Sequence, residues 1–255
     1  MRFCLLGSGS SGNATLVEMG ATRLLIDSGF SLKELELRLQ RKGVEASSLS
    51  AVVVTHEHND HIGGIGPLAR RHGLPVWMTR GSYRGAEKRL GTIPDLRLFN
   101  CHQPFVIDEL ELTPFPVPHD AHEPCQFVFS DGARRLGLLT DTGCSTPHIE
   151  QQLSGCDALI IECNHDVEML SKGPYPPALQ ARVGGGLGHL SNYQAAELTA
   201  SLDTSRLQHL VAAHLSEKNN RPELAAVALA GAVGASCEWV ALAEQQDGLD
   251  WRDIR

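Results

Sequence analysis

Short apolar stretches alternate with amphipathic ones along the whole chain, and this pattern predicts a mixture of strands and helices. Apolar runs of roughly four to eight residues between turn-forming residues are typical of strands. Such runs lie at residues 2–6, 15–18, 23–26, 51–55, 75–78, 105–107, 109–115, 126–130, 135–140, 158–161, 207–212 and 238–242. Between two of them, the pair Asp131-Gly132 predicts a hairpin turn.

The helical pattern is clearest after the third strand. Leucines at 32, 35 and 39 lie on one helix face, with Ser31 as a cap and Gly43 as a stop. Further helices are expected from the end of the fourth strand to about residue 72, and at 146–153, 192–202 and 222–232. Because strands alternate with helices in both halves, we expect two packed sheets with helices outside. No linker divides the chain, so we expect one domain over residues 1–255.

Composition narrows the class of protein. Hydrophobic residues make up 42% of the 255 residues but aromatic residues only 5%, so aliphatic side chains must supply most of the core. No apolar stretch approaches the roughly 20 residues that a membrane-spanning helix needs. The N-terminus turns polar too early for a signal peptide, and the seven cysteines form no C-x-x-C pair. These features favour a cytoplasmic protein with free thiols and no membrane contact.

The charge pattern leaves nucleic-acid binding open. A net charge of −8 does not indicate it, but bound divalent ions would add positive charge locally. One segment, 70–89, is strongly basic. It contains Arg70, Arg71, Arg80, Arg84, Lys88 and Arg89 against the single acid Glu87. The segment is either a phosphate-binding surface or a solvated helix face.

The strand predicted at 51–55 ends in four potential metal ligands within six residues. They are His56, His58, Asp60 and His61. On an extended backbone His56 and His58 point the same way, because side chains alternate with a period of two. Asp60 and His61 follow where the chain turns into a helix, so they can reach a second ion. Imidazole and carboxylate ligands favour zinc, with manganese or iron as alternatives.

Three later segments place a ligand at the end of a predicted strand. His119 follows the strand at 109–115, Asp141 follows the strand at 135–140, and His214 follows the strand at 207–212. Ligands at the ends of several strands converge on one edge of a sheet, where a rigid scaffold can hold them. The sequence therefore predicts a metal pocket at that edge.

This ordered set of seven ligands resembles that of the metallo-β-lactamase fold hydrolases, over essentially the whole chain. The resemblance implies a four-layer αββα sandwich, with two divalent metal ions at one edge. It implies that the first ion is held by His56, His58 and His119. It implies that the second is held by Asp60, His61 and His214, and that Asp141 bridges both.

Finer features separate groups within this family. The commonest true β-lactamases carry cysteine where Asp141 stands, and oxygen-reducing diiron members carry an acid in place of His58. Four local strings, at 7–13, 162–170, 188–192 and 213–220, resemble the bacterial YycJ/WalJ-type proteins, a group of metal-dependent nucleases. This narrower resemblance implies a 5′-to-3′ DNA exonuclease. His189 occupies the place of a catalytic histidine in tRNA 3′-processing endonucleases.

The resemblance implies roles for individual residues. A hydroxide bridging the two metals would attack a phosphodiester. Asp60 would orient that nucleophile or take its proton, and His189 would donate a hydrogen bond or a proton to phosphate or leaving oxygen. Alternatively, His189 has only a structural role at the start of a helix. Candidate substrate contacts are Asn13, His165, Ser191, Asn192, Arg80 and Arg84, and candidate supports of the metal ligands are His122, His165 and Glu162.

Two other functions remain open on the sequence. The same metals could hydrolyse a small cyclic phosphodiester, a thioester or a lactone. A signalling accessory protein with a secondary metal site is a third possibility, which the intact ligand set disfavours. The sequence does not decide between DNA and RNA as the substrate, the direction of cleavage, the physiological metal or the oligomeric state.

Overall fold

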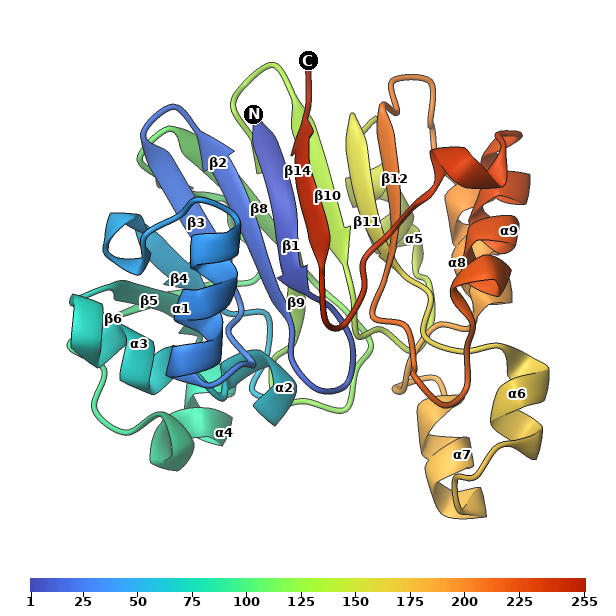
Figure 1. Cartoon of the computed structure of the whole chain (residues 1–255), viewed down its shortest axis with the longest axis horizontal. Helices are drawn as coiled ribbons and strands as arrows, with labels where there is room; N and C mark the ends of the chain where they lie inside the picture. Colours follow the sequence, from blue (N-terminus) through green and yellow to red (C-terminus); the bar gives the residue numbers. More distant parts are fainter.

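Two seven-stranded sheets pack face to face and carry helices on their outer faces, in a computed structural model that describes residues 1–255 (Figure 1). The arrangement is the predicted four-layer αββα sandwich. Metal-ligand positions at strand ends therefore fall at the edge of a sheet, as the strand pattern requires.

The first sheet has the order β14-β1-β2-β3-β4-β5-β6. Its strands are β1 (Arg2–Gly7), β2 (Ala14–Met19), β3 (Thr22–Ile26), β4 (Ala51–Val53), β5 (Pro75–Thr79), β6 (Asp95–Phe99) and β14 (Leu249–Asp253). The last strand pairs antiparallel with the first, so the two ends of the chain lie side by side (Figure 1). From β3 to β6 the strands are parallel, which directs their carboxyl ends to one edge.

The second sheet has the order β13-β12-β11-β10-β9-β8-β7. Its strands are β7 (Phe105–Ile107), β8 (Leu110–Pro116), β9 (Cys125–Ser130), β10 (Arg135–Leu139), β11 (Ala158–Glu162), β12 (His209–Ala213) and β13 (Ala241–Leu242). β9 and β10 form the hairpin predicted at Asp131-Gly132, and Gly132 has φ 89° there. β10, β11 and β12 run parallel, so their carboxyl ends also share one edge.

Alternation of side chains in β1 shows how the layers form. Phe3 and Leu5 join the core between the two sheets, whereas Cys4 and Leu6 face the helices outside. Each residue is at most 2% exposed. A strand that is apolar on both faces is expected in a sheet covered on both sides.

Nine helices complete the outer layers and one end of the molecule. They are α1 (Leu32–Arg41), α2 (Asn59–Ile62), α3 (Ile65–His72), α4 (Arg80–Leu90), α5 (Pro147–Leu153), α6 (Val167–Lys172), α7 (Pro177–Val183), α8 (Asn192–Ser201) and α9 (Pro222–Val233), with short 3₁₀ turns at Ala46–Ser48 and Cys237–Trp239. Helices α1, α3 and α4 pack on the first sheet and α5, α8 and α9 on the second. No helix has the length and apolarity needed to cross a lipid bilayer.

Several elements differ from the prediction. β6, β14, α4, α6 and α7 were not predicted, and the strand predicted at 238–242 is wrong except for its last two residues, because a 3₁₀ turn occupies 237–239. The helix predicted through residue 72 is broken into α2 and α3 at Gly63-Gly64. A Cβ on Gly64 would lie 2.1 Å from the Phe30 carbonyl oxygen, so this close approach requires glycine.

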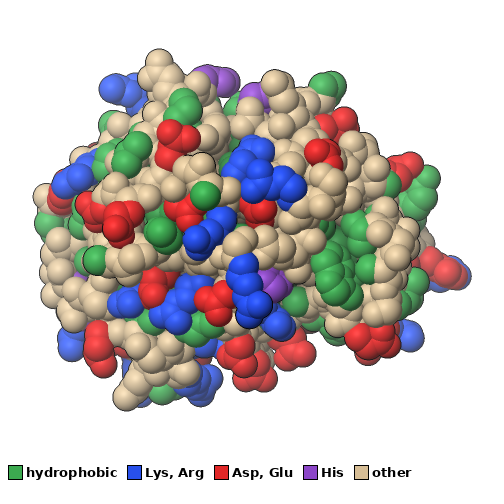
Figure 2. Space-filling model, turned by 90° about the horizontal axis from the view of Figure 1, so that it is seen from above, with side chains coloured by type: hydrophobic (Ala, Val, Ile, Leu, Met, Phe, Trp, Pro, Cys, Tyr) green, Lys and Arg blue, Asp and Glu red, His purple; other side chains and the backbone are tan.

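Charged side chains are mixed at the end of the molecule that carries both termini. Figure 2 shows this end, with lysine and arginine side chains interspersed among aspartate and glutamate. No broad surface of one sign of charge covers this end.

All seven cysteines are free, as predicted.

Candidate metal centre

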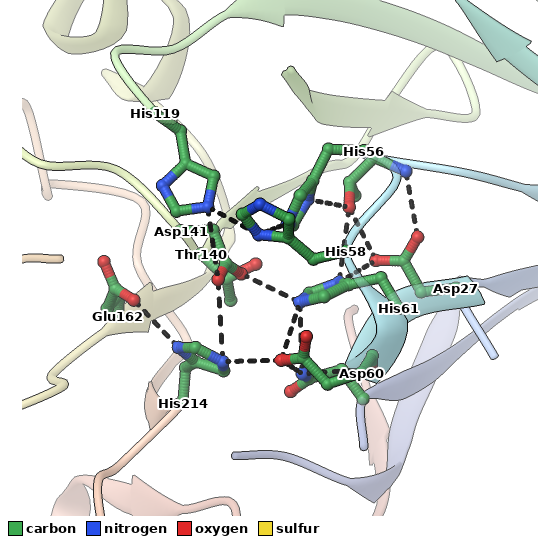
Figure 3. Close-up of polar contacts among 12 residues, drawn as sticks. Asp27, His56, His58, Asp60, His61, His119, Thr140, Asp141, Glu162 and His214 are labelled. Carbon is green, nitrogen blue, oxygen red and sulfur yellow. Dashed lines mark hydrogen bonds and ion pairs between the residues drawn. The ribbon is translucent and has the colours of Figure 1, made fainter. Parts of the chain in front are cut away.

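The seven predicted ligands meet at one edge of the sandwich, where strand ends from both sheets face each other (Figure 3). His56 follows β4, Asp141 follows β10 and His214 follows β12. Each lies at the carboxyl end of a parallel strand, and each is at most 2% exposed. The predicted ligands therefore converge at one edge, as the strand-end argument made from the sequence expects.

Three imidazoles converge in the first group. His56 Nε2 lies 3.1 Å from His58 Nδ1, and His119 Nε2 lies 3.2 Å from the same atom. His119 Nδ1 faces the Gly188 carbonyl oxygen at 3.1 Å and must carry the proton there, so Nε2 of the neutral ring presents a lone pair to the group. A shared cation satisfies all three at once, so the group suits a metal ion.

A carboxylate and two imidazoles form the second group. Asp60 Oδ2 lies 3.4 Å from His61 Nε2 and 3.6 Å from His214 Nε2. Asp141 stands between the groups, with Oδ2 3.3 Å from His61 Nε2 and Oδ1 4.0 Å from His119 Nε2. It is the one carboxylate in reach of both groups through different oxygens, which is the position of a bridging ligand.

The remaining ring nitrogen of four ligand histidines is held by an oxygen atom. These contacts are His56 Nδ1 with Thr55 Oγ1 (3.0 Å), His61 Nδ1 with Asp27 Oδ2 (2.8 Å), His119 Nδ1 with the Gly188 carbonyl (3.1 Å) and His214 Nδ1 with Glu162 Oε1 (2.9 Å). Such contacts fix the orientation of the ring and direct its free nitrogen at a metal. The support that Glu162 was expected to give is present.

Asp27 is a functional residue that sequence reasoning missed. It follows β3, and its carboxylate also accepts hydrogen bonds from the backbone N–H and the hydroxyl of Thr55. Its φ of 60° is shared by two other strand-end residues of the site, Asp141 (53°) and His214 (55°). Side chains rarely adopt this left-handed conformation unless the surroundings enforce it. The strand-end position that identified Asp141 and His214 would have identified Asp27 too.

The electrostatics of the site favour bound positive charge. Burial lowers the pKa of the His214 imidazole, but Asp141, Asp60 and Glu162 outweigh this and raise it to about 10. Burial also lowers the pKa of His61, but the carboxylates of Asp141, Asp60 and Asp27 outweigh this and raise it well above its usual value. Burial instead lowers the pKa of His56. In the absence of a metal, protons on His61 and His214 thus supply the positive charge that balances the carboxylates, and a bound metal cation would take over this role.

Buried side-chain atoms without a hydrogen-bond partner show whether the cluster suits a metal ion. Asp141 Oδ2 and His214 Nε2 are buried and have no hydrogen-bond partner. Buried polar atoms without partners are costly and call for a ligand. Their donor types, nitrogen and oxygen, suit a transition-series divalent ion. The residues therefore fit the metal that the cluster implies.

His189 lies beside the ligands and is paired differently from them. Its Nδ1 donates to Glu162 Oε1 at 2.8 Å, and the side chain is 21% exposed. Burial lowers the pKa of His189, but Glu162 outweighs this and raises it. Glu162 also accepts from the backbone N–H groups of Thr142 and Leu190. Since Nδ1 is occupied, Nε2 is the nitrogen that remains for a substrate.

A cavity of about 400 Å³ opens over the ligands. Asp60, Asp141, His189 and His214 are among its lining residues. Of the basic segment 70–89, Arg89 lines the cavity, whereas the predicted substrate contacts Arg80 and Arg84 do not. Arg182, which the sequence did not single out, lines it from α7.

The other predicted substrate contacts lie behind the cavity wall. Asn13 is 8% exposed and its side-chain amide donates to Asp60 Oδ2 at 3.3 Å, so it supports a ligand. Ser191 caps α8 and Asn192 pairs with Asn220. The Asn192 N–H donates to the carbonyl of His165, whose side chain is buried. None of these four residues lines the cavity.

His122 takes part in another contact. Its backbone N–H and its Nδ1 both contact Glu57 Oε1, and its side chain is 64% exposed. Glu57 lies between His56 and His58 in the chain, so this pair ties the 119–123 loop to the first ligand segment without touching a ligand ring.

Comparisons with known proteins agree with this geometry. A family model described as a β-lactamase superfamily domain matches residues 22–214. The chain is 37% identical over 227 residues to the exodeoxyribonuclease YycJ of Bacillus anthracis, covering 88% of this chain and 86% of YycJ. It is 34% identical over 228 residues to the exodeoxyribonuclease WalJ of Streptococcus pneumoniae serotype 2, covering 88% and 85%.

A solved structure shares the fold. The metallo-β-lactamase fold protein YhfI of Bacillus subtilis matches with a TM-score of 0.77 and 18% identity, over 99% of both chains. The chain therefore belongs to the β-lactamase superfamily of metallo-β-lactamase fold proteins.

Proposed function

We propose that the chain is a dinuclear metal-dependent nuclease that degrades DNA from the 5′ end. The observation that carries the proposal is the juxtaposition of the ligand groups, His189 and two arginines in one cavity. The similarity to two exodeoxyribonucleases, over most of the length of each, supports a nuclease and a DNA substrate.

In this proposal each ligand has one role. His56, His58 and His119 hold one divalent ion, Asp60, His61 and His214 hold the other, and Asp141 contacts both. When bound, the ions would activate a water molecule and stabilise the charge that develops on the phosphate. We propose zinc, with manganese or iron as alternatives, because of the imidazole-rich donor set.

Two residues of the chain handle protons in the proposed reaction. Asp60 would take the proton that the attacking water loses, and the Asn13 amide, which donates to Asp60 Oδ2 at 3.3 Å, holds that carboxylate in place beside the second group. His189 is held through Nδ1 and donates from Nε2 to a phosphate oxygen or to the leaving oxygen of the phosphodiester. Although burial lowers the pKa of His189, Glu162 raises it on balance, which favours the protonated form of that donor.

A digestion panel tests the proposal. Single- and double-stranded DNA and RNA, labelled at either end, are incubated with protein reconstituted with zinc, manganese or iron. We expect mononucleotides to be released first from the 5′ end of DNA. Release from the 3′ end would contradict the direction, and degradation of RNA alone would contradict the substrate.

The cavity volume favours one alternative. At about 400 Å³ it is near the lower end of ligand pockets, roughly 300–1,000 Å³, so a small cyclic phosphodiester, thioester or lactone would also fit. Turnover of such a compound by protein that leaves every oligonucleotide intact would establish this alternative.

A further inference from the structure

Two helical segments border the cavity on different sides. One comprises α2 and α4, which follow the first ligand segment. The other, which we call the 175–188 wall, comprises α7 and the loops flanking it, and supplies Tyr175, Leu179, Arg182, Val183 and Gly188 to the cavity. The two segments project from opposite ends of the edge that carries the ligands (Figure 1). The cavity over the ligands is lined from both segments.

Arg182 is fixed to the cavity by one contact. Its Nε donates to Asp120 Oδ2 at 2.6 Å, while the side chain is 62% exposed. Asp120 follows the ligand His119, and its Oδ1 lies 3.6 Å from His119 Nε2. The Asp120 N–H also donates to the Leu187 carbonyl, which ties the wall to the ligand segment. Arg182 thus keeps both terminal nitrogens free while its position is fixed.

Arg89 is anchored on the other side, through its two terminal nitrogens rather than through Nε, so that each of them keeps one N–H for phosphate. Its Nη1 donates to Asn59 Oδ1 at 2.7 Å and its Nη2 to the Gly85 carbonyl at 2.9 Å. Asn59 precedes the ligand Asp60 and also lines the cavity. Each arginine is therefore anchored by a polar side chain next to a metal ligand.

We propose that Arg89 and Arg182 form a two-sided phosphate clamp that holds a single DNA strand across the metal centre, an inference that rests on the proposed nuclease function. Guanidinium groups bind phosphate through paired hydrogen bonds. A chain of net charge −8 needs local cations to hold a polyanion, and these two are the arginines that line the cavity.

Asp120 is a positioning residue in this clamp. Its contact uses Nε of Arg182, so phosphate can bind Nη1 and Nη2 without breaking the ion pair. Tyr175 is the one aromatic residue of the cavity wall outside the histidines, and it offers a face on which a base can stack. The clamp therefore favours single-stranded 5′ ends over blunt duplex ends.

Kinetics of the metal-loaded protein test the clamp. The variants are Arg182→Ala, Arg182→Lys and Arg89→Ala, with Arg252→Ala as a control that removes an exposed charge from β14, outside the cavity. For a single-stranded oligonucleotide we expect kcat/KM to fall about 10-fold or more in each alanine variant, mainly through KM, because a charged hydrogen bond is lost. Arg182→Lys should be intermediate, and Arg252→Ala should match the unaltered protein.

Salt dependence separates phosphate contacts from general damage. Each lost contact should reduce the log–log slope of affinity against salt by about 0.7 for a single strand. Hydrolysis of a small chromogenic phosphodiester, which has no flanking phosphates, should fall much less than that of the oligonucleotide. Equal losses on the small substrate and the oligonucleotide, or an effect of Arg252→Ala equal to that of Arg182→Ala, would overturn the clamp. An unaltered protein that degrades no oligonucleotide would refute the proposed function itself, whereas full activity of both arginine variants would refute only the clamp.

Discussion

Two parts of the site are built in opposite ways. The floor is the buried cluster of predicted metal ligands with the residues that support them, and the walls are the helical segments that carry Arg89 and Arg182. On the floor, His61 and His214 have side chains at most 2% exposed, and each ring is fixed through its second nitrogen. On the wall, Arg182 is 62% exposed and fixed by one ion pair. A buried, cross-braced floor holds ligands at fixed distances, where charge interactions are strong. An exposed wall can adapt to a polymer but gives weaker contacts, so the floor should govern turnover and the walls affinity.

Removing a floor ligand should have the largest effect. We expect Asp60→Ala to lose metal and nearly all turnover, because Asp60 is the carboxylate of the second group.

His189→Ala should lose about 10²–10³-fold in rate while keeping its metal, because one charge-stabilising donor is removed. Elemental analysis beside single-turnover kinetics would check both. Metal loss in His189→Ala equal to that in Asp60→Ala would make His189 a ligand.

Removing a support of the floor should have the next largest effect. Asp27→Asn should weaken metal affinity by about 10–100-fold, because Asp27 orients the His61 ring at 2.8 Å. Competition with a chelator of known affinity would measure it. Asp95→Asn, on an exposed part of β6, is the matched control. Unchanged affinity in Asp27→Asn would show that His61 is oriented without it.

The floor also predicts a dependence of stability on pH. The folded pKa of His214, about 10, lies above the unfolded value of about 6.5, so protonated His214 stabilises the metal-free protein fully below pH 6.5. That contribution is lost as pH rises toward 10. Metal binding needs the neutral ring, so the gain in melting temperature on adding metal should widen over the same range. Thermal melts with and without metal would check this, and a constant gain would contradict it.

The smallest effect should come from arginines outside the cavity. Arg80 and Arg84 belong to the same helix as Arg89 but do not line the cavity. Exposed charges are screened and contribute little, so replacing both with alanine should change KM for a single strand by no more than about twofold. Steady-state kinetics beside Arg89→Ala would check this. An effect as large as that of Arg89→Ala would mean that the whole basic segment binds DNA.

The positions of the floor ligands could be predicted from the sequence, whereas of the walls only the basic segment that contains Arg89 could be. Ligands such as Asp141 and His214 follow apolar strands, and parallel strands bring their ends to one edge, so their meeting follows from local patterns. Asp27 obeys the same pattern but was not recognised, since a single carboxylate after a strand is common. Ser191 and Asn192 were expected to contact substrate, yet Ser191 forms a capping box and the Asn192 N–H is bonded to the His165 carbonyl.

The walls depend on contacts between distant residues. Arg182 reaches the cavity through Asp120, 62 positions earlier in the chain, and no local pattern records that pairing. The short helix α7 lies between the proline-rich stretch 173–177 and the glycine-rich stretch 184–188, whose composition indicates a loop. The edge strand β14 pairs with β1 across almost the whole chain. Because both pairings join residues far apart in the chain, local sequence patterns do not indicate them.

The most direct test of the central claim is digestion of single-stranded DNA, labelled at its 5′ end, by metal-stripped protein before and after zinc or manganese is restored. We predict no release of label without metal and progressive release of labelled mononucleotide once metal is restored. Asp60→Ala should stay inactive under both conditions. Release of label that is equal with and without metal, or in Asp60→Ala, would contradict a metal-dependent nuclease at this site.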